Sequence, residues 1–178
     1  MELSKEKIVF EVIKGRRSVR SFKDEEVPRE MLIRILEAGQ WAPNPSNVQS
    51  WRFIVVQEAK QLGTLKTLSP GFPKAPAAIV VCSDQRDMKR FGETLRLILT
   101  AEEAAMAVQN MLLMAYSLGF GSCPVASFSK AGIKELLELP GHIYPILLVA
   151  LGFPDEQPVP PQRKELLRIT FWERYQEE

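Results

Sequence analysis

Histidine and cysteine are scarce in this sequence, which excludes several kinds of catalytic site. The only histidine is His142, in a turn that contains proline and glycine (LPGHIYP). Metal clusters and Ser-His or Cys-His couples normally need a positioned imidazole, so we expect no metal site and no histidine-activated nucleophile. Cys82 and Cys123 are too few for a disulfide framework, and Cys82 lies in a strand-like apolar run that predicts a buried, inert thiol. If the protein is an enzyme, a bound cofactor is expected to carry the chemistry.

An excess of either charge and a long uncharged apolar run are also missing. The chain has 23 Lys and Arg against 22 Asp and Glu, for a formal net charge of +1. This balance gives no general attraction to nucleic acid or to anionic lipid, so we expect neither nucleic acid nor membrane as a partner. The first residues, MELSKEKIVFEVIKG, lack the apolar segment and cleavage site of a signal peptide. We therefore expect a cytoplasmic protein.

The hydrophobic pattern predicts one domain, residues 1–178, in which helices alternate with strands. Apolar residues at helical spacing and stop signals predict helices over 5–14, 28–40, 58–68, 93–118 and 129–138. Apolar and β-branched runs predict strands over 51–57, 77–83 and 144–154, with a shorter extended segment over 121–128. Strands separated by helices favour an α+β or α/β three-layer domain. Periodicity leaves the order of the strands open.

The helix over 93–118 and the C-terminal tail are the two segments that suggest a partner chain. Beyond Glu103 the helix is apolar on nearly every face, which predicts a helix buried all round, either in the centre of the domain or at a subunit contact. The tail begins rich in proline and ends amphipathic, so we expect it to reach across a partner.

A cluster of arginines follows the first predicted helix. Arg16, Arg17 and Arg20 lie within five residues, together with the hydroxyl of Ser18. Guanidinium groups bind phosphate through paired hydrogen bonds, so the cluster is suited to a phosphate or another dianion. A solvated basic turn is the alternative interpretation. A nucleic-acid patch is less favoured, because no aromatic residues are interleaved with the basic ones.

Three further segments offer contacts to a ligand. The loop Pro43–Gln49 has two stiffening prolines and the polar groups of Asn44, Ser46, Asn47 and Gln49, which suit a heterocycle edge or a sugar chain as well as a plain connection. The small residues of 120–128 would let a flat ligand approach the backbone, although a structural turn is the simpler interpretation. Arg163 and Lys164 add two cations late in the chain, where a solvated face is the plain alternative.

Taken together and in this order, these segments resemble the nitroreductase family from about residue 8 to residue 172. The resemblance is carried by RRSVRSF near the start, APNPSN-x-QSWRF in the polar loop, a Lys-Ala-Pro-Ala turn before a strand, GFGSCP after the long helix, and P-x-R-K-x-L near the end. It implies a homodimer with an α+β fold, in which three layers (α/β/α) contain a mixed central sheet flanked by helices. The long helix would pack at the dimer interface, and the tail 159–178 would pack on the partner subunit.

The resemblance also implies two FMN molecules between the subunits. Arg16, Arg17, Ser18 and Arg20 would hold the FMN phosphate and ribityl end, and Arg163 and Lys164 would add charge at the same phosphate. Backbone of Pro124, Val125, Ala126 and Ser127 would lie along the isoalloxazine ring. The loop that ends at Gln49 would reach the flavin from the partner subunit, through the residues Pro43, Asn44, Pro45, Ser46 and Asn47.

The activity implied by the resemblance is hydride transfer from NAD(P)H, through the flavin, to nitroaromatic, quinone or similar small acceptors in a ping-pong cycle. No side-chain acid or base is required. Two departures bear on the substrate: the stretch from Gln57 to Lys74 is short, and Ala126 stands where some nitroreductases carry an acidic residue. Residues 84–94, with Met88, Phe91 and the following Leu95, are expected to wall the pocket.

Three alternatives remain. Reductive dehalogenation or breakdown of the flavin itself would use the same scaffold, but no clear lid is visible. A non-catalytic flavin carrier would bind FMN without reacting with acceptors. A nucleophilic, partly exposed Cys123 is the last and weakest hypothesis.

Overall fold

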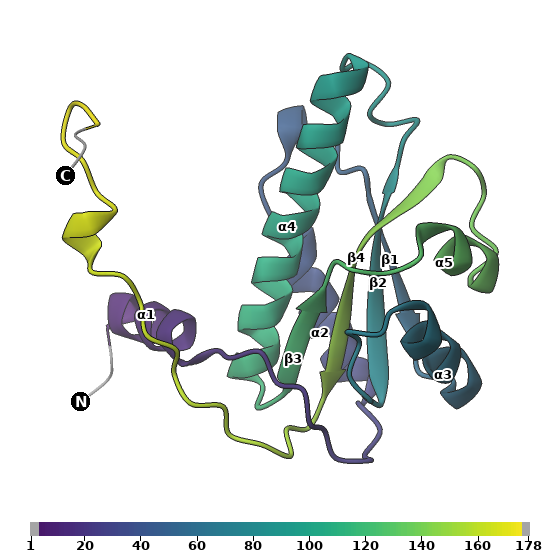
Figure 1. The fold of residues 1–178 in the computed structure, drawn as a ribbon, viewed down its shortest axis with the longest axis horizontal. Coiled ribbons are helices and arrows are strands. Elements are labelled where there is room, and N and C mark those ends of the chain that lie inside the picture. Colours follow the sequence, from purple (N-terminus) through teal and green to yellow (C-terminus); the bar gives the residue numbers. More distant parts are fainter. Residues whose placement is uncertain (1–3, 176–178) are drawn as a thin grey trace.

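A four-stranded sheet forms the middle layer of the molecule, with helices packed on both faces (Figure 1). The computed structural model describes residues 4–175. The strands are β1 (Trp51–Val56), β2 (Ala77–Asp84), β3 (Gly121–Val125) and β4 (Ile143–Gly152), in the order β1-β2-β4-β3. Each pair of neighbouring strands is antiparallel. The two edges of the sheet are therefore β1 and β3.

Burial of both faces of β2 explains the two helical layers. The helices are α1 (Lys5–Gly15), α2 (Arg29–Gln40), α3 (Ala59–Leu68), α4 (Glu93–Ser117) and α5 (Lys130–Leu136). Ile79 and Val81 join an apolar cluster with residues of α2 and α4, whereas Val80 and Cys82 join a second cluster with residues of α3 and α5. Successive side chains of a strand point to opposite faces, so a strand that is apolar at nearly every position needs cover on both sides.

The helices and strands predicted from periodicity are all present, with ends that differ by at most three residues. Side chains of Ser4, Glu58 and Ser129 accept backbone N–H groups in the first turns of α1, α3 and α5, which fixes where these helices begin. The predicted α+β fold class, with three layers, is confirmed. The expected mixed sheet is corrected to an antiparallel one, because all three pairs of neighbouring strands run antiparallel. Among the described residues, parallel pairing is limited to an isolated bridge between Ser18 and Ser122.

The long helix α4 differs from the expectation of burial all round. Within one chain it buries a single stripe against the sheet and α2, which includes Ala104, Val108 and Met111. In the first turns of α4, Leu97 is 63% exposed and Ile98 is 50% exposed. Burial in the centre of the domain therefore does not account for the apolar character of this helix. By length and composition alone, α4 is also long and apolar enough to span a membrane. Core helices of water-soluble proteins meet the same two criteria.

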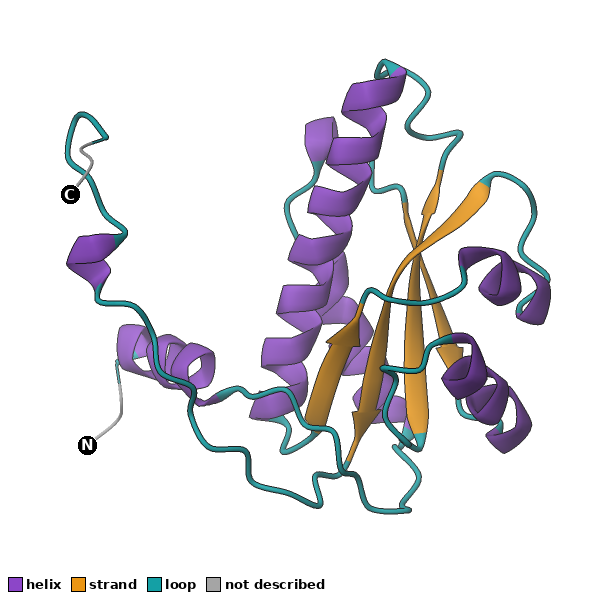
Figure 2. Cartoon of the chain, in the orientation of Figure 1, coloured by secondary structure: helices purple, strands orange, loops and turns teal. Residues whose placement is uncertain are grey.

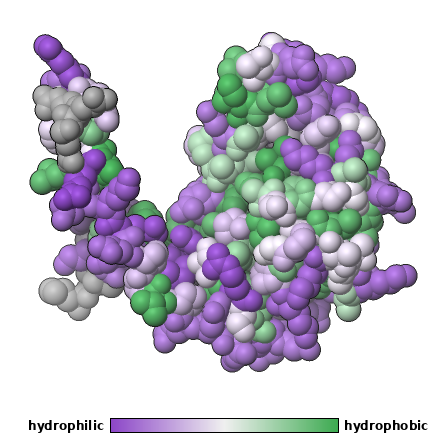
Figure 3. All heavy atoms as spheres, viewed as in Figure 1, coloured by the Kyte–Doolittle hydropathy of each residue, from purple (hydrophilic) through white to green (hydrophobic). Residues whose placement is uncertain are grey.

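Helix α1 and the C-terminal tail project together from one side of the body (Figures 1 and 2). No residue of α1 is buried, and its apolar residues Ile8, Val9, Phe10 and Ile13 are about half exposed. The tail contains one short 3-10 turn, Leu166–Arg168, and its apolar side chains are exposed as well. Figure 3 shows apolar surface on this arm and at the end of the body where α4 begins. Residues 176–178 of the tail lie outside the described residues.

Replacement of Gly121 by alanine is expected to destabilise the fold. Gly121 is the first residue of β3, and it lies directly against Val19. A Cβ atom at Gly121 would lie 2.9 Å from the Cβ of Val19, which is too close and cannot be relieved by a side-chain rotation. We expect Gly121→Ala to lower the free energy of unfolding by about 1–3 kcal/mol, measured by urea denaturation.

Gly63→Ala is the matched control. Gly63 lies in α3, and no atom lies within 4 Å of the position that an added methyl group would take, so alanine there should be neutral or stabilising by up to about 1 kcal/mol. Equal free energies of unfolding for Gly121→Ala and the wild type would contradict the proposed contact.

Candidate functional site

The arginine turn is held against β3 and the end of β4 by backbone hydrogen bonds. The N–H of Val19 donates to the carbonyl oxygen of Ser122 at 3.0 Å, and the N–H of Lys23 donates to the carbonyl oxygen of Phe153 at 2.9 Å. The carboxylate of Glu156 accepts the N–H groups of both Arg20 and Ser21. These bonds give the turn one conformation, so its cationic side chains start from fixed positions.

Cations from the two ends of the chain meet at this turn. Arg16 is half-buried, and burial lowers the pKa of its guanidinium below the usual range. The charges of Arg17 and Arg163 lower that pKa further, which places Arg163 of the tail close to Arg16. Like charges brought together in a partly desolvated place repel one another, so the cluster favours the binding of an anion.

Arg17 has a structural task at this position. Its Nη1 donates to the carbonyl oxygens of Lys14 at 2.6 Å and of Arg16 at 2.7 Å, where the negative end of the α1 dipole lies. Its Nε is buried without a hydrogen-bond partner among the described residues. The guanidinium therefore closes the C-terminus of α1 and leaves its buried Nε free to donate to another group.

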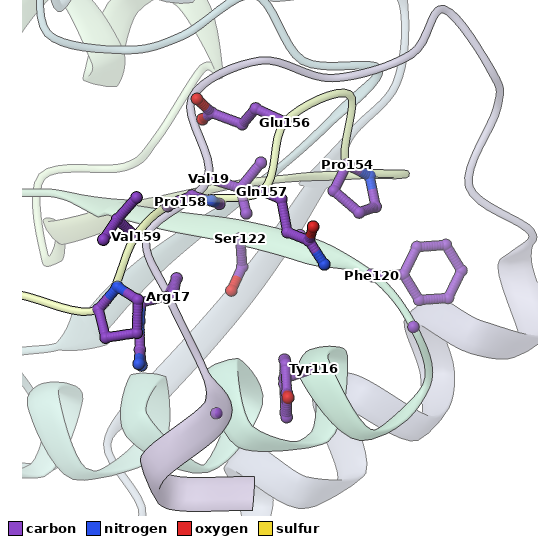
Figure 4. A pocket seen from close by; sticks show the side chains of 14 residues that line it. Arg17, Val19, Tyr116, Phe120, Ser122, Pro154, Glu156, Gln157, Pro158 and Val159 are labelled. Atoms are coloured by element: carbon purple, nitrogen blue, oxygen red, sulfur yellow. The ribbon is translucent and has the colours of Figure 1, made fainter.

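A cavity of about 590 Å³ opens between the arginine turn, the C-terminal end of α4 and the tail. Figure 4 shows Arg17, Val19 and Ser122 around its middle, with Tyr116 on one side and Glu156 on the other. Gly15 and Gly121 also line the cavity, and each packs so closely on a neighbouring wall residue, Tyr116 or Val19, that an added Cβ atom would clash with it.

The segment Pro124–Ser127 lies at the free edge of β3. Because the Ser122 carbonyl points away from β4 toward Val19, the same outward direction recurs two residues later at Pro124. Pro124 is exposed and has no N–H to donate, as expected of an edge strand. Val125 is buried, whereas Ala126 and Ser127 are exposed, and the carbonyl of Ser127 is fixed by the Ser69 hydroxyl at 2.8 Å. The strand edge beside the arginine turn is thus open to a flat ligand.

The polar loop Pro43–Gln49 has an unusual and well-fixed backbone. Ser46, Asn47 and Gln49 have φ angles of 49°, 55° and 53°, which is a left-handed backbone conformation that residues other than glycine seldom adopt. The N–H of Gln49 donates to Oδ1 of Asn44 at 2.9 Å. From the neighbouring segment, Arg90 donates to the carbonyl of Ser46 at 3.2 Å. The loop is held by hydrogen bonds within itself and from one side.

Sheet order separates this loop from the arginine turn within one chain. The loop leads into β1, which forms the edge opposite β3. Trp51, at the start of β1, pairs with Ser83 at one end of β2, whereas Gly121 pairs with Gly152 at the other end of the sheet. The chain therefore brings together the arginine turn, the β3 edge and Arg163, and it leaves the polar loop at the opposite edge.

Of the residues expected to wall the pocket, Met88 is fully buried and Leu95 is half exposed. Met88 therefore belongs to the interior, while Arg90 of the same segment contacts the polar loop. The exposed Lys164 lies beside Arg163 in the tail. In the part of the chain that the structure describes, no group of three His, Cys, Asp or Glu side chains is arranged to hold a metal ion.

The expectation that the side chain of Cys123 is partly exposed, on which the nucleophile hypothesis depends, is wrong. Cys123 is only 3% exposed, and burial raises the pKa of its thiol, an effect that the nearby Arg20 opposes. Cys82 is fully buried, and burial raises the pKa of its thiol to about 12, which confirms the predicted inert state. Neither thiol is ionised near neutral pH, so neither is a ready nucleophile.

Sequence reasoning missed three polar features. Glu156 fixes the arginine turn, although nothing in its surroundings in the sequence sets it apart. Asp84 is buried between Arg52 and Arg86, and the hydrogen bonds from Arg86 lower the pKa of its carboxyl to about 2. Glu103 is 1% exposed inside the apolar stripe of α4 and joins Ser50 in a buried hydrogen bond. An acidic residue at a core position of an apolar helix was the available signal for Glu103.

Comparison with known proteins bears on this site. The nitroreductase family model matches residues 13–153. A Methanothermobacter thermautotrophicus protein, provisionally named NADH dehydrogenase/NAD(P)H nitroreductase, is 34% identical over 84% of this chain and 79% of its own length. A Thermotoga neapolitana protein named iodotyrosine deiodinase is 27% identical over 92% of this chain and 98% of its own length.

Among solved structures, the NADPH:FMN oxidoreductase from Vibrio harveyi in complex with NAD⁺ superposes with a TM-score of 0.85 at 26% identity, over 94% of this chain and 78% of that one. The family model covers the arginine turn from Arg16, the polar loop and the β3 edge, and it ends just after β4. This chain belongs to the nitroreductase family.

Proposed function

We propose that this protein is an FMN-dependent oxidoreductase, which takes hydride from NAD(P)H and passes it to nitroaromatic, quinone or similar acceptors in a ping-pong cycle. The observation that carries the proposal is the crowding of Arg16, Arg17 and Arg163 beside the open edge of β3. The names of the relatives, an NAD(P)H nitroreductase and an NADPH:FMN oxidoreductase, support it.

The donor set at the arginine turn fits the phosphate of FMN. Burial and the neighbouring charges together lower the pKa of Arg16. A phosphate dianion would relieve the repulsion among the guanidinium groups, and it would give the buried Nε of Arg17 an acceptor. Arg16, Ser18, Arg20, Arg163 and Lys164 would hold the phosphate and ribityl end. Arg17 would act mainly by closing α1, because its Nη1 is already engaged by carbonyl oxygens.

The free edge of β3 fits the flavin ring. Pro124, Ala126 and Ser127 are exposed, and their small side chains leave the backbone open to a flat molecule. When bound, FMN supplies a ring that accepts hydride from NAD(P)H and returns it to an oxidised acceptor. The backbone of Pro124–Ser127 would orient that ring. No side chain is required as acid or base.

The complete site would need a second copy of the chain. The polar loop Pro43–Gln49 lies at the edge of the sheet opposite the arginine turn, so the loop of one protomer would complete the site of the other. The exposed apolar residues of α1 and α4 would be covered in the same dimer. The tail from residue 159, with Leu166, Leu167 and Trp172 exposed, would pack on the partner.

Reductive dehalogenation is a second candidate, supported by the relative named iodotyrosine deiodinase. Release of halide from a halogenated aromatic by the reduced protein would favour this activity over nitro or quinone reduction. A protein that binds FMN, and whose reduced form reacts with none of these acceptors, would be a flavin carrier.

A visible absorption spectrum of the purified protein tests the proposed function. We expect a flavin spectrum that bleaches when NADH or NADPH is added without oxygen, and that returns when a nitroaromatic or a quinone is added. The bleaching reports hydride uptake from NADH or NADPH, and the return of the spectrum reports hydride delivery to the acceptor. A colourless protein that also fails to take up added FMN would contradict the proposal.

Loss of one arginine is expected to weaken cofactor binding. Arg16→Ala and Arg20→Ala each remove a charge-assisted contact worth about 1.5–3 kcal/mol, so the dissociation constant of FMN should rise by about 10- to 140-fold. The constant is measured by quenching of FMN fluorescence. Arg34→Ala removes the same charge from an exposed position on α2, outside the arginine turn, and should leave the constant unchanged. If both turn variants keep stoichiometric flavin after dialysis, the phosphate assignment is wrong.

A further inference from the structure

A buried chain of polar groups joins the long helix to the polar loop. Nε2 of Gln85 donates to Oγ of Ser83 at 3.1 Å, and the hydroxyls of Ser83 and Ser50 are 2.6 Å apart. The hydroxyl of Ser50 donates to Oε1 of Glu103 on α4. Ser50, Ser83 and Glu103 are each at most 1% exposed. The chain of hydrogen bonds therefore runs from β2 through the start of β1 and ends on a carboxyl in the core.

Ser50 is the buried end of the exposed polar loop. Ser46, Asn47 and Gln49 lie in the loop at the surface, whereas Ser50, the next residue, is fully buried. Its carbonyl accepts the N–H of Asp84 at 2.7 Å, and its hydroxyl enters the chain that ends at Glu103. Because Gln49 is left-handed and directly precedes this anchor, the conformation of the loop depends on how firmly Ser50 is held.

Burial of Glu103 is costly unless the carboxyl has a use. Among the described residues, its second oxygen, Oε2, has no hydrogen-bond partner, and neither does the buried hydroxyl of Thr100, which lies three residues earlier on the same helix. An apolar side chain would match the rest of this stripe, which includes Ala104, Ala107 and Val108. An apolar residue at position 103 could not accept the hydrogen bond that the hydroxyl of Ser50 donates to Glu103.

Burial, more than any nearby charge, favours the neutral form of the Glu103 carboxyl. Burial is the main cause that raises the pKa of this carboxyl, Asp87 adds to the rise, and the hydrogen bond from Ser50 and the charge of Arg52 oppose it. Arg52 is already paired with Asp84 and Asp87. Asp84 is also paired with Arg86, and the Nε of Arg96, about two helical turns earlier on α4, is buried without a partner in the described chain. Within residues 4–175, no salt bridge joins a cation to Glu103.

We infer that Glu103 is a positioning residue, which acts through Ser50 to fix the loop Asn44–Gln49 and thereby strengthens the cofactor site to which that loop contributes. The cofactor part of this inference rests on the proposed function. The anchoring of the loop does not, so the two are tested separately.

Hydrogen exchange of the loop amides tests the anchoring. Glu103→Leu keeps the approximate volume and removes the acceptor, and we expect exchange over residues 44–50 to become about tenfold faster, as the loss of a hydrogen bond implies. Glu103→Gln keeps a neutral acceptor and should exchange like the wild type. Glu102→Gln, on the exposed neighbour, is the control for a change of charge on α4.

If Glu103→Leu fails to fold, Ser50→Ala removes the same hydrogen bond from the side of the loop and takes its place. Wild-type exchange over residues 44–50 in a folded Glu103→Leu or Ser50→Ala protein would overturn the inference. Equal loosening in Glu103→Gln would also overturn it, because the acceptor is then irrelevant.

The dissociation constant of FMN tests the second step. Ser50→Ala and Glu103→Leu should each raise it by about tenfold, and the double variant should be no worse than either one, because both remove the same bond. Additive effects would show two independent roles and would refute the coupling. A wild-type protein that does not bind FMN would contradict the proposed function, while the exchange measurement would still decide whether Glu103 anchors the loop.

Proton linkage supplies a test that is independent of the cofactor. With a pKa above its ordinary value of 4.5, Glu103 keeps its proton in the folded protein at pH values where the unfolded chain has lost it. Folding is then progressively less favourable as the pH rises above that value, until the folded carboxyl ionises as well. We expect the urea midpoint of the wild type to fall relative to that of Glu103→Gln as the pH rises through the range above 4.5. A constant difference across this range would contradict a neutral, buried Glu103.

Discussion

Burial of the two central strands on both faces is the constraint on which the rest of the structure depends. Every residue of β2 is buried, and most of β4 is buried with it, so the centre of the sheet has no room for a ligand. Only the edge strands offer free backbone. The arginine turn pairs with one edge, at β3, and the polar loop leads into the other, at β1. The proposed cofactor site would therefore be an edge site, and its two halves would be separated by the width of the sheet within one chain.

The two edges of the sheet differ in their balance of charge. At the β3 edge, Arg16, Arg17 and Arg163 lie close together, and the nearby carboxylate of Glu156 is occupied by backbone N–H groups. At the β1 edge, charges are paired: Arg52 and Arg86 neutralise Asp84, and Glu103 is buried among hydroxyls. Unbalanced positive charge suits an anion, whereas the balanced edge supports a neutral polar loop.

The apolar surface connects these observations to assembly. The exposed face of α4, the whole of α1 and the tail carry apolar residues that one chain does not cover. A hydrophobic helix face that gains nothing from its own domain is stabilised by a partner. In the proposed dimer the same burial would bring the loop of one protomer to the arginine turn of the other, so association and cofactor binding would depend on a common surface.

The sequence by itself determined the elements and most of the chemistry. Local periodicity and caps placed the helices and strands within a few residues, because these signals act over one or two turns. Residue type alone made the RRSVR cluster a candidate for binding an anion and left a solvated basic turn as the alternative. Only the tertiary structure decided what depends on distant contacts. It brought Arg163 to Arg16, assigned Arg17 to the end of α1, buried Cys123 and placed Glu103 against Ser50. Most of these outcomes join residues far apart in the chain or follow from burial by several elements, and packing of the sheet, rather than local spacing, determines which groups meet.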